Sequence, residues 1–592
     1  MSTRSVKCCF FAVLPDIMAD PADWDPDIVS AVRKYALQNA VEYAGEGQSG
    51  SVLGRLLAER EDLRRMAREI MALVDAEVAA ANSMAASQGV DAVRAELEQS
   101  APEALKRRKH QKAQGLRELP GDTSGGVVLR FAPNPNGPLS LGHSRGVAIN
   151  SEYARMYGGK VVLRFDDTDT KVKPPVPDAY GWIADEYEWL AGRPADMVIR
   201  ASERMPVYLE HAERMIAGGF GYVCSCSAAE FRKLREEKKD CPCRDRAASD
   251  SLSDWNAMNA GEIAEGDAVV RVKTDMTLPN PALRDWPALR IQYAPHPMVG
   301  ERYKVWPLLD FQSAIEDHEQ GVTHIVRGKD LMDSTRKQTL LYEHFGWDYP
   351  ETLYWGRIKV HEFGGFSTSR MRASIEAGEY SGWDDARLPT LKALQRRGFR
   401  AQSLRDFWID LGLTQKDISI SMQTIESFNA KRIDALTERR SFVRDPVMLA
   451  LDRSSAPGGP GSQITIPKHP GGTIEGFREW SVGESVAVQS ADAAAGSIRL
   501  KEYADIEASG ESAAVGSWDR SDDRPVVHWL PASMGRDAVL HRPEGGRIVS
   551  ESGLLEDFEL EVGEIYQLER VGFAKLDELP EKGPASLLWL HG

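Results

Sequence analysis

Apolar residues recur every three or four positions through residues 19–118, where Ala, Leu, Arg and Glu predominate. This spacing gathers the apolar side chains on one face of a helix, so the pattern predicts a mainly helical N-terminal region. Near its end, KRRKHQK (106–112) forms a basic run. We expect this run to be a solvated helix end rather than an RNA contact.

From Val127 onward, short apolar runs alternate with helical patterns. The run VVLRF leads through a loop rich in Pro, Asn and Gly into the helical pattern LGHSRGVAINSEYARMY. A second run, KVVLRF, ends at Asp166 and is followed by a helical pattern to about Leu190. Strands followed by helices indicate an α/β fold of the nucleotide-binding type.

The pattern changes three times further along the chain. Residues 201–305 have a mixed pattern and predict an insertion, after which GVTHIVRGKDL returns to a strand and a loop. Residues 370–437 have a helical pattern. Beyond Arg440, short alternating strands broken by Gly and Pro predict β-barrels.

Composition narrows the class of protein. The 592 residues suggest three to five domains, and 42% hydrophobic with 27% charged residues is typical of a soluble globular protein. The net charge of −16 argues against a general nucleic-acid coat, although a local basic face could still bind RNA. No apolar run reaches membrane-spanning length, and CCFFAVL near the N-terminus is a poor signal peptide, which leaves Met18 as an alternative start. We therefore expect a cytoplasmic protein with no membrane partner.

The segment RFAPNPNGPLSLGHSRG (130–146) carries the first candidate chemistry. A strand, a Gly-rich turn and a helix N-terminus form a phosphate site, because free backbone N–H groups and the helix dipole point at the anion. Gly142 lets the backbone approach a ligand closely, and His143 can place a donor beside a phosphate.

Two further segments allow more than one interpretation. In LRFDDTDT (163–170), the carboxylates of Asp166, Asp167 and Asp169 either hold a ligand ammonium or cap a helix, and the segment alone does not decide. In FSTSRMRAS (366–374), the hydroxyls and Arg370 either cradle phosphates or cap the following helix.

Four of the six cysteines form two close pairs, Cys224–x–Cys226 and Cys241–x–Cys243. Four thiolates so placed favour a structural tetrahedral Zn²⁺ site in a reducing compartment. The alternatives are small buried residues or a redox pair.

Together these segments resemble class I aminoacyl-tRNA synthetases of the glutamyl/glutaminyl subfamily, in its archaeal glutamyl form. Residues 130–146 resemble the HIGH signature, which appears in that subfamily as R-F-A/P-P-x-P-x-G-x-L-H-x-G-H, and residues 366–374 resemble the KMSKS signature. The match is strong over about residues 120–450. Three positions depart from the family pattern: Ser140 replaces His, Arg370 replaces Lys and Leu309 replaces Tyr. Ser140 is either a tolerated variant or a weaker phosphate ligand, and Leu309 is assigned no binding role.

The resemblance implies the site residues. It implies His143 and Arg370 as catalytic residues, Arg130, Asp166 and Arg327 as glutamate ligands, and the four cysteines as zinc ligands. It also implies an ATP site that uses Mg²⁺ and is formed by Pro133, Asn134, Gly137, Ser140, Gly142, His143, Ser367, Thr368, Ser369 and Arg370.

The resemblance also implies a multidomain α/β architecture. Its expected parts are a helical N-terminal domain (1–118), a Rossmann-like catalytic domain in two halves (119–200 and 306–357), an acceptor-binding insertion with the zinc site (201–305), a helical subdomain with the second signature (358–437) and anticodon-binding β-barrels (438–592).

The activity implied is that of a glutamate–tRNA ligase, with ATP, L-glutamate and tRNA(Glu) as partners, and tRNA(Gln) as an open second substrate. The alternatives are a glutamine–tRNA ligase on the same scaffold and a non-catalytic, synthetase-derived tRNA-binding protein. Ser140 and Arg370 motivate the last of these.

Overall fold

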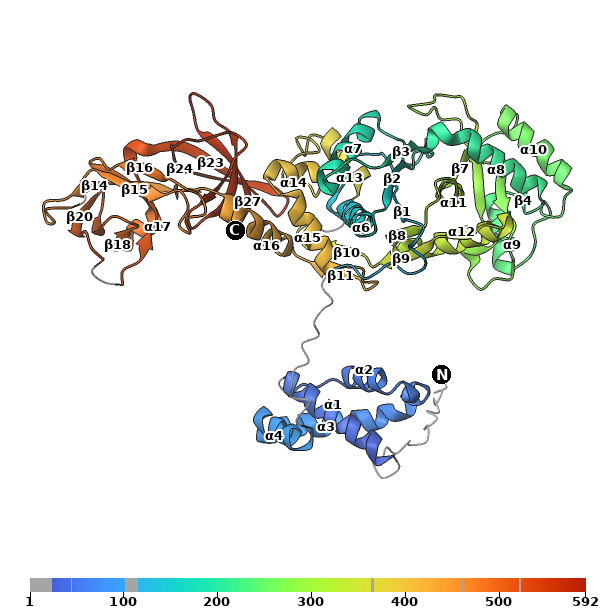
Figure 1. Ribbon diagram of the computed structural model, residues 1–592, viewed down its shortest axis with the longest axis horizontal. Coiled ribbons are helices and arrows are strands. Elements are labelled where there is room, and N and C mark those ends of the chain that lie inside the picture. The colour runs from blue at the N-terminus through green and yellow to red at the C-terminus, as the bar shows by residue number, and fades with distance from the viewer. Residues whose placement is uncertain (1–23, 44, 102–114, 364–366, 460, 521–522) are drawn as a thin grey trace, which may run out of the picture. The chain divides into compact units, whose positions relative to one another are not determined.

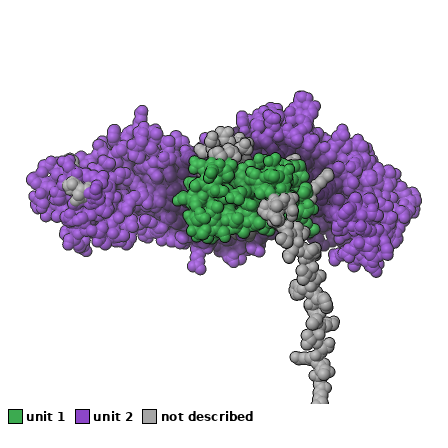
Figure 2. Space-filling model, turned by 90° about the horizontal axis from the view of Figure 1, so that it is seen from below, with its two compact units in different colours: residues 1–112 green, residues 113–592 purple. Residues whose placement is uncertain are grey.

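The structure is a computed structural model that describes residues 24–43, 45–101, 115–363, 367–459, 461–520 and 523–592. The chain divides into two compact units, residues 1–112 and residues 113–592, which Figure 2 shows in different colours. Each unit has apolar cores of its own.

The first unit is helical, as its sequence pattern predicts. Its helices are α1 (Pro26–Glu42), α2 (Ser49–Glu59), α3 (Ala67–Gln88) and α4 (Val90–Ser100) (Figure 1). The Asp25 carboxylate accepts a hydrogen bond from the Asp27 backbone N–H and so caps α1, which has proline at its first position. The basic run at 106–112 lies outside the described residues.

A parallel sheet organises the second unit. Strands β1 (Val128–Phe131), β2 (Lys160–Phe165) and β3 (Met197–Arg200) pair in the order β1-β2-β3, and β8 (His324–Gly328) pairs with β9 (Glu351–Trp355). The Thr323 N–H donates to the Val128 carbonyl oxygen across 3.0 Å, which places the start of β8 beside β1. The strand order reverses at β1, and α/β proteins bind ligands at the carboxyl ends of the strands beside such a reversal.

The alternation of side chains along β1 and β2 separates an apolar face from a charged face. Leu129, Phe131 and Leu163 join the core that includes residues of α6 (Leu141–Tyr157) and α7 (Pro177–Ala191). Arg130 and Arg164 point the other way, because successive side chains of a strand face opposite sides. That charged face is covered by α11 (Leu309–Glu319), whose side chains pair with both arginines.

The insertion between β3 and α11 contains an antiparallel sheet. Its strands pair in the order β4 (Gly221–Cys224), β5 (Val269–Val272), β6 (Pro287–Ile291) and β7 (Val305–Pro307). The insertion also contains three helices, α8 (Met205–Ala217), α9 (Ala228–Glu237) and α10 (Ala248–Ala260).

The helical region that follows contains a pair of strands that the sequence pattern did not reveal. After α12 (Met332–Phe345), the expected helices at 370–437 are α13 (Thr368–Glu376), α14 (Leu391–Arg397), α15 (Ala401–Leu411) and α16 (Met422–Ile433). Between them, β10 (Ile358–Val360) and β11 (Ile418–Ile420) form a short parallel pair. Three-residue strands are too short to show a period in the sequence.

The C-terminal part is built of β-strands, as predicted. The strands form two seven-stranded sheets. The first has the order β12 (Arg439–Arg440), β25 (Ile565–Leu568), β26 (Gly572–Glu578), β27 (Ala585–His591), β23 (Gly535–Glu544), β24 (Arg547–Glu556) and β13 (Phe442–Arg444), in which β23 and β24 form a long hairpin. The second has the order β21 (Val526–Val527), β18 (Ser497–Leu500), β19 (Asp505–Ser509), β20 (Ser512–Ser517), β14 (Pro446–Asp452), β17 (Ser485–Gln489) and β22 (Trp529–Pro531). No helix among the described residues combines the length and the apolar character that a membrane crossing needs.

Candidate functional site

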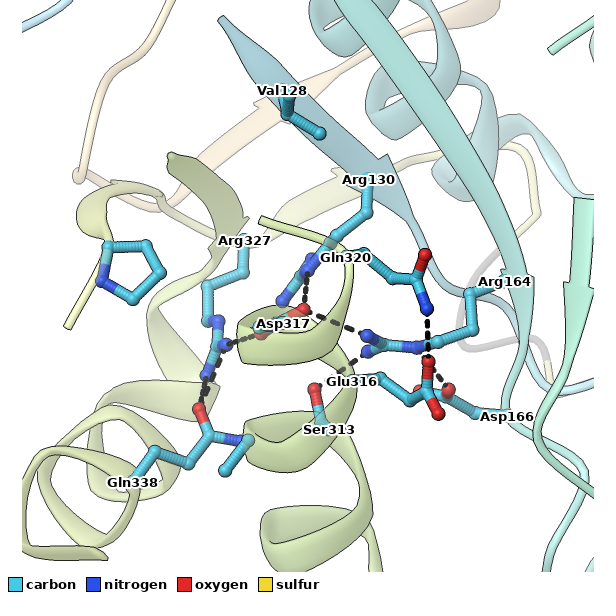
Figure 3. A network of polar contacts seen from close by, with 12 residues as sticks. Val128, Arg130, Arg164, Asp166, Ser313, Glu316, Asp317, Gln320, Arg327 and Gln338 are labelled. Carbon is cyan, nitrogen blue, oxygen red and sulfur yellow. Dashed lines mark hydrogen bonds and ion pairs between the residues drawn. The ribbon is translucent and has the colours of Figure 1, made fainter. Parts of the chain in front are cut away.

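Three buried arginines converge on one carboxylate at the edge of the parallel sheet (Figure 3). Oδ1 of Asp317 lies 2.8 Å from Nη1 of Arg164 and 3.4 Å from Nε of Arg130. Oδ2 of the same carboxylate lies 3.9 Å from Nη2 of Arg327. Arg130 and Arg164 come from neighbouring strands, Asp317 from α11 and Arg327 from β8, so the fold brings four separate segments together here.

The charges in this cluster do not balance. Arg130, Arg164 and Arg327 carry three positive charges, whereas Asp317 and Asp166 carry two negative ones, which leaves one positive charge in excess. Burial alone would raise the pKa of Asp317, but the three guanidiniums outweigh it and hold the pKa of that carboxyl below its usual range. Burial lowers the pKa of Arg130, and the other two arginines lower it further, against the effect of Asp317. A buried positive charge of this kind is stabilised by an anionic ligand.

Of the three acids that follow β2, Asp166 belongs to this cluster. Its Oδ1 accepts hydrogen bonds from Nε of Arg164 (2.8 Å) and Nε2 of Gln312 (3.0 Å). Among the described residues no partner is recorded for its Oδ2, which can therefore accept a bond from a ligand. Asp166 thus stands beside the arginines, where the sequence predicted a glutamate ligand.

The other two acids serve the protein itself. Asp167 is fully buried and accepts hydrogen bonds from the Tyr180 hydroxyl (2.6 Å) and from the Ser202 hydroxyl and N–H (2.7 Å each). Burial raises the pKa of Asp167 despite these bonds. Asp169 caps the following turn through the N–H groups of residues 171 and 172 and pairs with Arg290 at 3.0 Å.

The first signature loop is hydrogen-bonded to Asp166, which directly follows β2. The Pro133 carbonyl accepts the Asp166 N–H at 3.0 Å, and Nδ2 of Asn134 donates to the Asp166 carbonyl at 3.0 Å. Oδ1 of Asn134 is buried and has no recorded partner among the described residues. The loop therefore fixes the backbone of Asp166, and beside it lies the Asn134 Oδ1 atom, an acceptor with no partner among the described residues.

Ser140 and His143 interact directly at the start of α6. The Ser140 N–H donates to Nδ1 of His143 across 3.1 Å, and the Ser140 hydroxyl lies 3.2 Å from the same nitrogen. Because Nδ1 accepts, the proton of the neutral ring is on Nε2. The protein around the His143 ring disfavours the imidazolium, and this desolvation, with the smaller effect of the Lys173 charge, lowers its pKa to about 4, although part of the side chain is exposed. At neutral pH, His143 thus presents an uncharged Nε2–H donor.

Gly137 brings the two signature segments against each other. A Cβ at Gly137 would lie 2.5 Å from Cγ2 of Thr368 and 3.2 Å from the Trp383 ring, so only glycine fits. The Arg372 guanidinium also donates to the Asn136 carbonyl. Residues 134–137 and 368–372 are therefore in contact, although about 230 residues separate them in the chain.

A pocket of about 250 Å³ lies beside the N-terminus of α6. It is lined by Leu141, Gly142, Arg145, Asp330, Trp355, Gly356, Arg357, Ile358, Val360 and Trp408. The Arg145 side chain forms part of the pocket wall, and its guanidinium donates to the carbonyls of Gly356 (3.1 Å) and Gly412 (2.9 Å). A Cβ at Gly142 would meet only the Ser140 hydroxyl, at 3.7 Å, so protein packing does not require glycine here. An aromatic pocket beside a helix N-terminus suits a flat heterocycle that carries phosphates.

The Ser367 hydroxyl of the second signature has a structural role in this structure. Oγ of Ser367 accepts the Arg370 N–H at 3.3 Å and caps α13, which is the alternative that the sequence left open. Ser369 follows Thr368 in the first turn of that helix. Ser367 and Arg370 line a different pocket, of about 420 Å³, together with Arg387 and the turn between β23 and β24. The structure thus joins Thr368 to the first signature loop but does not place Arg370 in the pocket beside Gly142.

The four cysteines form one cluster at the start of the insertion. Their sulfur atoms all lie within 4.8 Å of one another, with Cys224–Cys241 at 3.6 Å, Cys226–Cys241 at 3.3 Å and Cys226–Cys243 at 3.9 Å. A tetrahedral Zn²⁺ with bonds of about 2.3 Å sets sulfur atoms about 3.8 Å apart. The cysteines form no disulfide, and three of the four are buried. Their arrangement therefore fits a closed metal site.

Comparison with known proteins identifies the family. Residues 126–435 match the model of the catalytic domain of class I tRNA synthetases (E and Q). This chain belongs to that family. The match contains both signature segments, the insertion with the cysteine cluster and the three arginines of the charged cluster.

Relatives extend the similarity over nearly the whole chain. The chain is 42% identical to the glutamate–tRNA ligase of Methanosarcina mazei over 93% of its own length and 97% of that protein. It is 43% identical to the glutamate–tRNA ligase of Methanothrix thermoacetophila over 94% of its length and 98% of that protein. The corresponding enzyme of Pyrococcus abyssi is 41% identical, with 92% and 96% covered.

Several residues of the charged cluster escaped the sequence analysis. Arg164, Asp317 and Gln338 were not assigned, yet each contacts a residue that was. One signal was available: the pentapeptide VVLRF occurs at both 127–131 and 161–165. An arginine at the same place in two apolar strands indicates a shared charged face. Asp317 and Gln338 lie within helices of mixed polarity, where sequence alone does not show which polar residues face inward.

Proposed function

We propose that the chain is a glutamate–tRNA ligase, which activates L-glutamate with ATP and transfers the glutamyl group to tRNA(Glu). The observation that carries this proposal is the buried excess of positive charge at Arg130, Arg164 and Arg327. Glutamate and glutamine have nearly the same shape, so a pocket that distinguishes them must respond to charge. The names of the relatives at 41–43% identity support the same activity.

The reaction has two steps. An oxygen of the α-carboxylate of glutamate attacks the α-phosphorus of ATP; a new O–P bond forms, the bond to the bridging oxygen of the β-phosphate breaks, and pyrophosphate leaves. A hydroxyl of the 3′-terminal ribose of tRNA then attacks the glutamyl carbonyl and loses its proton, and AMP leaves with the bonding electrons. No covalent enzyme intermediate is required, so the protein acts by positioning and by charge stabilisation.

We assign the side-chain carboxylate of glutamate to Arg130 and Arg327 and its ammonium to Asp166. We assign the adenine ring to the pocket of about 250 Å³ and the phosphates to the N-terminus of α6, with His143 as the donor. Mg²⁺, which accompanies ATP, would neutralise part of the triphosphate charge. Arg370 would reach the phosphates only if α13 or its own side chain moved, since it lines the second pocket here.

We assign Zn²⁺ to Cys224, Cys226, Cys241 and Cys243, whose sulfur spacing fits a tetrahedral site. Four thiolates leave no open position, so the metal would be structural. These four thiols form no disulfide, which also supports a cytoplasmic, reducing setting.

The test is ATP–pyrophosphate exchange with glutamate and with glutamine, followed by charging of tRNA(Glu) and tRNA(Gln). We expect exchange with glutamate to exceed exchange with glutamine by orders of magnitude, because an amide would leave the buried charge uncompensated. Faster exchange with glutamine would make the chain a glutamine–tRNA ligase. Neither exchange nor tRNA charging with either amino acid would leave a non-catalytic tRNA-binding protein.

A further inference from the structure

Gln338, on α12, holds Arg327 by a contact that carries no charge (Figure 3). Oε1 of Gln338 accepts hydrogen bonds from both Nη1 and Nη2 of Arg327, each at 3.1 Å. Both residues are buried, with 1% of Gln338 and 4% of Arg327 exposed. This oxygen is therefore the principal partner of the Arg327 guanidinium in the cluster.

The surroundings fix which way the amide faces. Nε2 of Gln338 donates to the Asp310 carbonyl at 3.1 Å, so the amide nitrogen must point away from Arg327. The Tyr349 hydroxyl gives the same Oε1 a third hydrogen bond, at 2.7 Å. An amide nitrogen in place of that oxygen would set donors against donors. The side chain is therefore locked with its acceptor toward the guanidinium.

An amide oxygen orients a guanidinium without cancelling its charge. The carboxylate nearest to Arg327, Asp317, is 3.9 Å away and is shared with Arg130 and Arg164. Nε of Arg327 is buried and has no recorded partner among the described residues. Arg327 thus retains an uncompensated charge and an unused donor, and buried donors are otherwise nearly always hydrogen-bonded.

We propose that Gln338 is a specificity-determining positioning residue: it aims Arg327 at the substrate and leaves its charge for the side-chain carboxylate of glutamate. The proposal rests on the proposed function, since it names the group that sustains the choice of glutamate over glutamine. A glutamate at this position would have nearly the same shape and would form a buried ion pair with Arg327, while its second oxygen would face the Asp310 carbonyl oxygen without donating to it. The guanidinium would then have its anion inside the protein and would no longer need one from the substrate.

The decisive variant is Gln338→Glu in the full-length protein, with ATP–pyrophosphate exchange measured over a range of glutamate and glutamine concentrations. We expect kcat/KM for glutamate to fall about a hundredfold, the scale of losing a desolvated charge pair. We expect kcat/KM for glutamine to stay constant or rise, and the KM for ATP to stay within about twofold of the wild-type value. A ratio of glutamate to glutamine use that falls less than tenfold would overturn the proposal.

Further variants distinguish an effect of the introduced charge on substrate choice from an effect on folding. Gln38→Glu is the matched control, because Gln38 accepts a hydrogen bond from Arg55 at 3.2 Å in the helical first unit, and it should keep the wild-type ratio. Tyr349→Phe removes one donor but no charge, and should shift KM equally for both amino acids.

If Gln338→Glu does not fold, as judged by circular dichroism, the proposal is tested with Gln338→Met instead. It removes the acceptor, so KM for glutamate should rise at least tenfold while KM for ATP holds; an unchanged KM for glutamate would sink the idea.

The wild-type assay separates this proposal from the function on which it rests. If the wild-type protein does not prefer glutamate, the proposed function fails. If it prefers glutamate and Gln338→Glu preserves that preference, only the role of Gln338 fails.

Discussion

At the residue scale, the charges of the buried cluster determine the chemistry that the pocket can accept. Replacing either partner of a buried pair leaves the other without compensation, so the cost exceeds the value of one hydrogen bond. Arg327 tests this point best, because among the described residues the one carboxylate within 4 Å of it, Asp317, also pairs with Arg130 and Arg164.

Arg327→Gln should therefore lower glutamate-dependent ATP–pyrophosphate exchange by roughly a hundredfold and narrow the gap to glutamine. The variant removes the charge and retains a hydrogen-bonding group in the pocket. Lys171→Met is a suitable control, because Lys171 forms an exposed ion pair with Glu265 at 2.8 Å, and such a pair contributes little to stability. Wild-type discrimination in Arg327→Gln would show that another residue selects the substrate.

His143→Ala should reduce exchange by about a hundredfold, the effect of losing a preorganised donor to a charged transition state. Because the pKa of His143 is lowered to about 4, the ring stays neutral above pH 5, and its titration should add no inflection to the rate between pH 5 and 8. The variant and the wild-type protein should thus differ by a constant factor over that range. A factor that changes around pH 6.5 would mean that the imidazolium is the active form.

Sequence reasoning identified candidate residues within continuous motifs and missed the partners that other elements supply. The first signature, the acids after β2 and the cysteine pairs are each local, and the fold places Asp166 and Arg130 in one cluster as expected. Asp317 and Gln338 became visible only when α11 and α12 packed against the sheet. The pairing of β10 with β11 likewise depends on a contact between residues about 60 apart, which no short window contains.

At the element scale, the contact between the two signature segments depends on the absence of a side chain. A Cβ at Gly137 would lie 2.5 Å from Cγ2 of Thr368, closer than packed carbon atoms approach each other. An added methyl group would therefore push the first loop and α13 apart.

Gly137→Ala should separate these two segments. We expect a thermal stability loss of about 1–3 kcal/mol, the usual cost of overpacking, and a several-fold rise in the KM for ATP. Thr368→Ser removes the clashing methyl group, so the double variant should recover part of both losses. If the double variant is no better than Gly137→Ala, the contact with the Trp383 ring, at 3.2 Å, is the one that matters.

The insertion supplies the second element-scale prediction. Purified protein should contain one Zn²⁺ per chain, and Cys224→Ser combined with Cys243→Ser should abolish it, since two of four ligands are lost. The cysteines join a small core of their own with Tyr222, Phe231 and Met276, so metal loss should first unfold that part of the insertion. Charging of tRNA should then fall more than glutamate-dependent exchange. Absence of zinc from the wild-type protein would refute the assignment.

At the scale of the whole molecule, the apolar cores follow the division into two units. The core of the first unit includes only residues from Trp24 to Ala101. The core that surrounds β1, β2 and α6 draws on residues from Leu116 to Leu590, with no member from the described part of residues 1–112. The charged cluster, both signature segments and the cysteines all lie in the second unit. Units with separate cores usually fold as separate domains.

Removal of residues 1–112 should therefore leave glutamate activation largely intact. We expect the fragment 113–592 to keep glutamate-dependent ATP–pyrophosphate exchange within about threefold of the full-length rate, because every residue assigned to ATP and glutamate remains. Calorimetry of the full-length protein should show a transition that is missing from the fragment and is reproduced by residues 1–112 alone. The fragment could still lose tRNA charging, which would assign the helical unit to the tRNA and not to the chemistry. A folded fragment without exchange activity would instead show that the first unit contributes to the site itself.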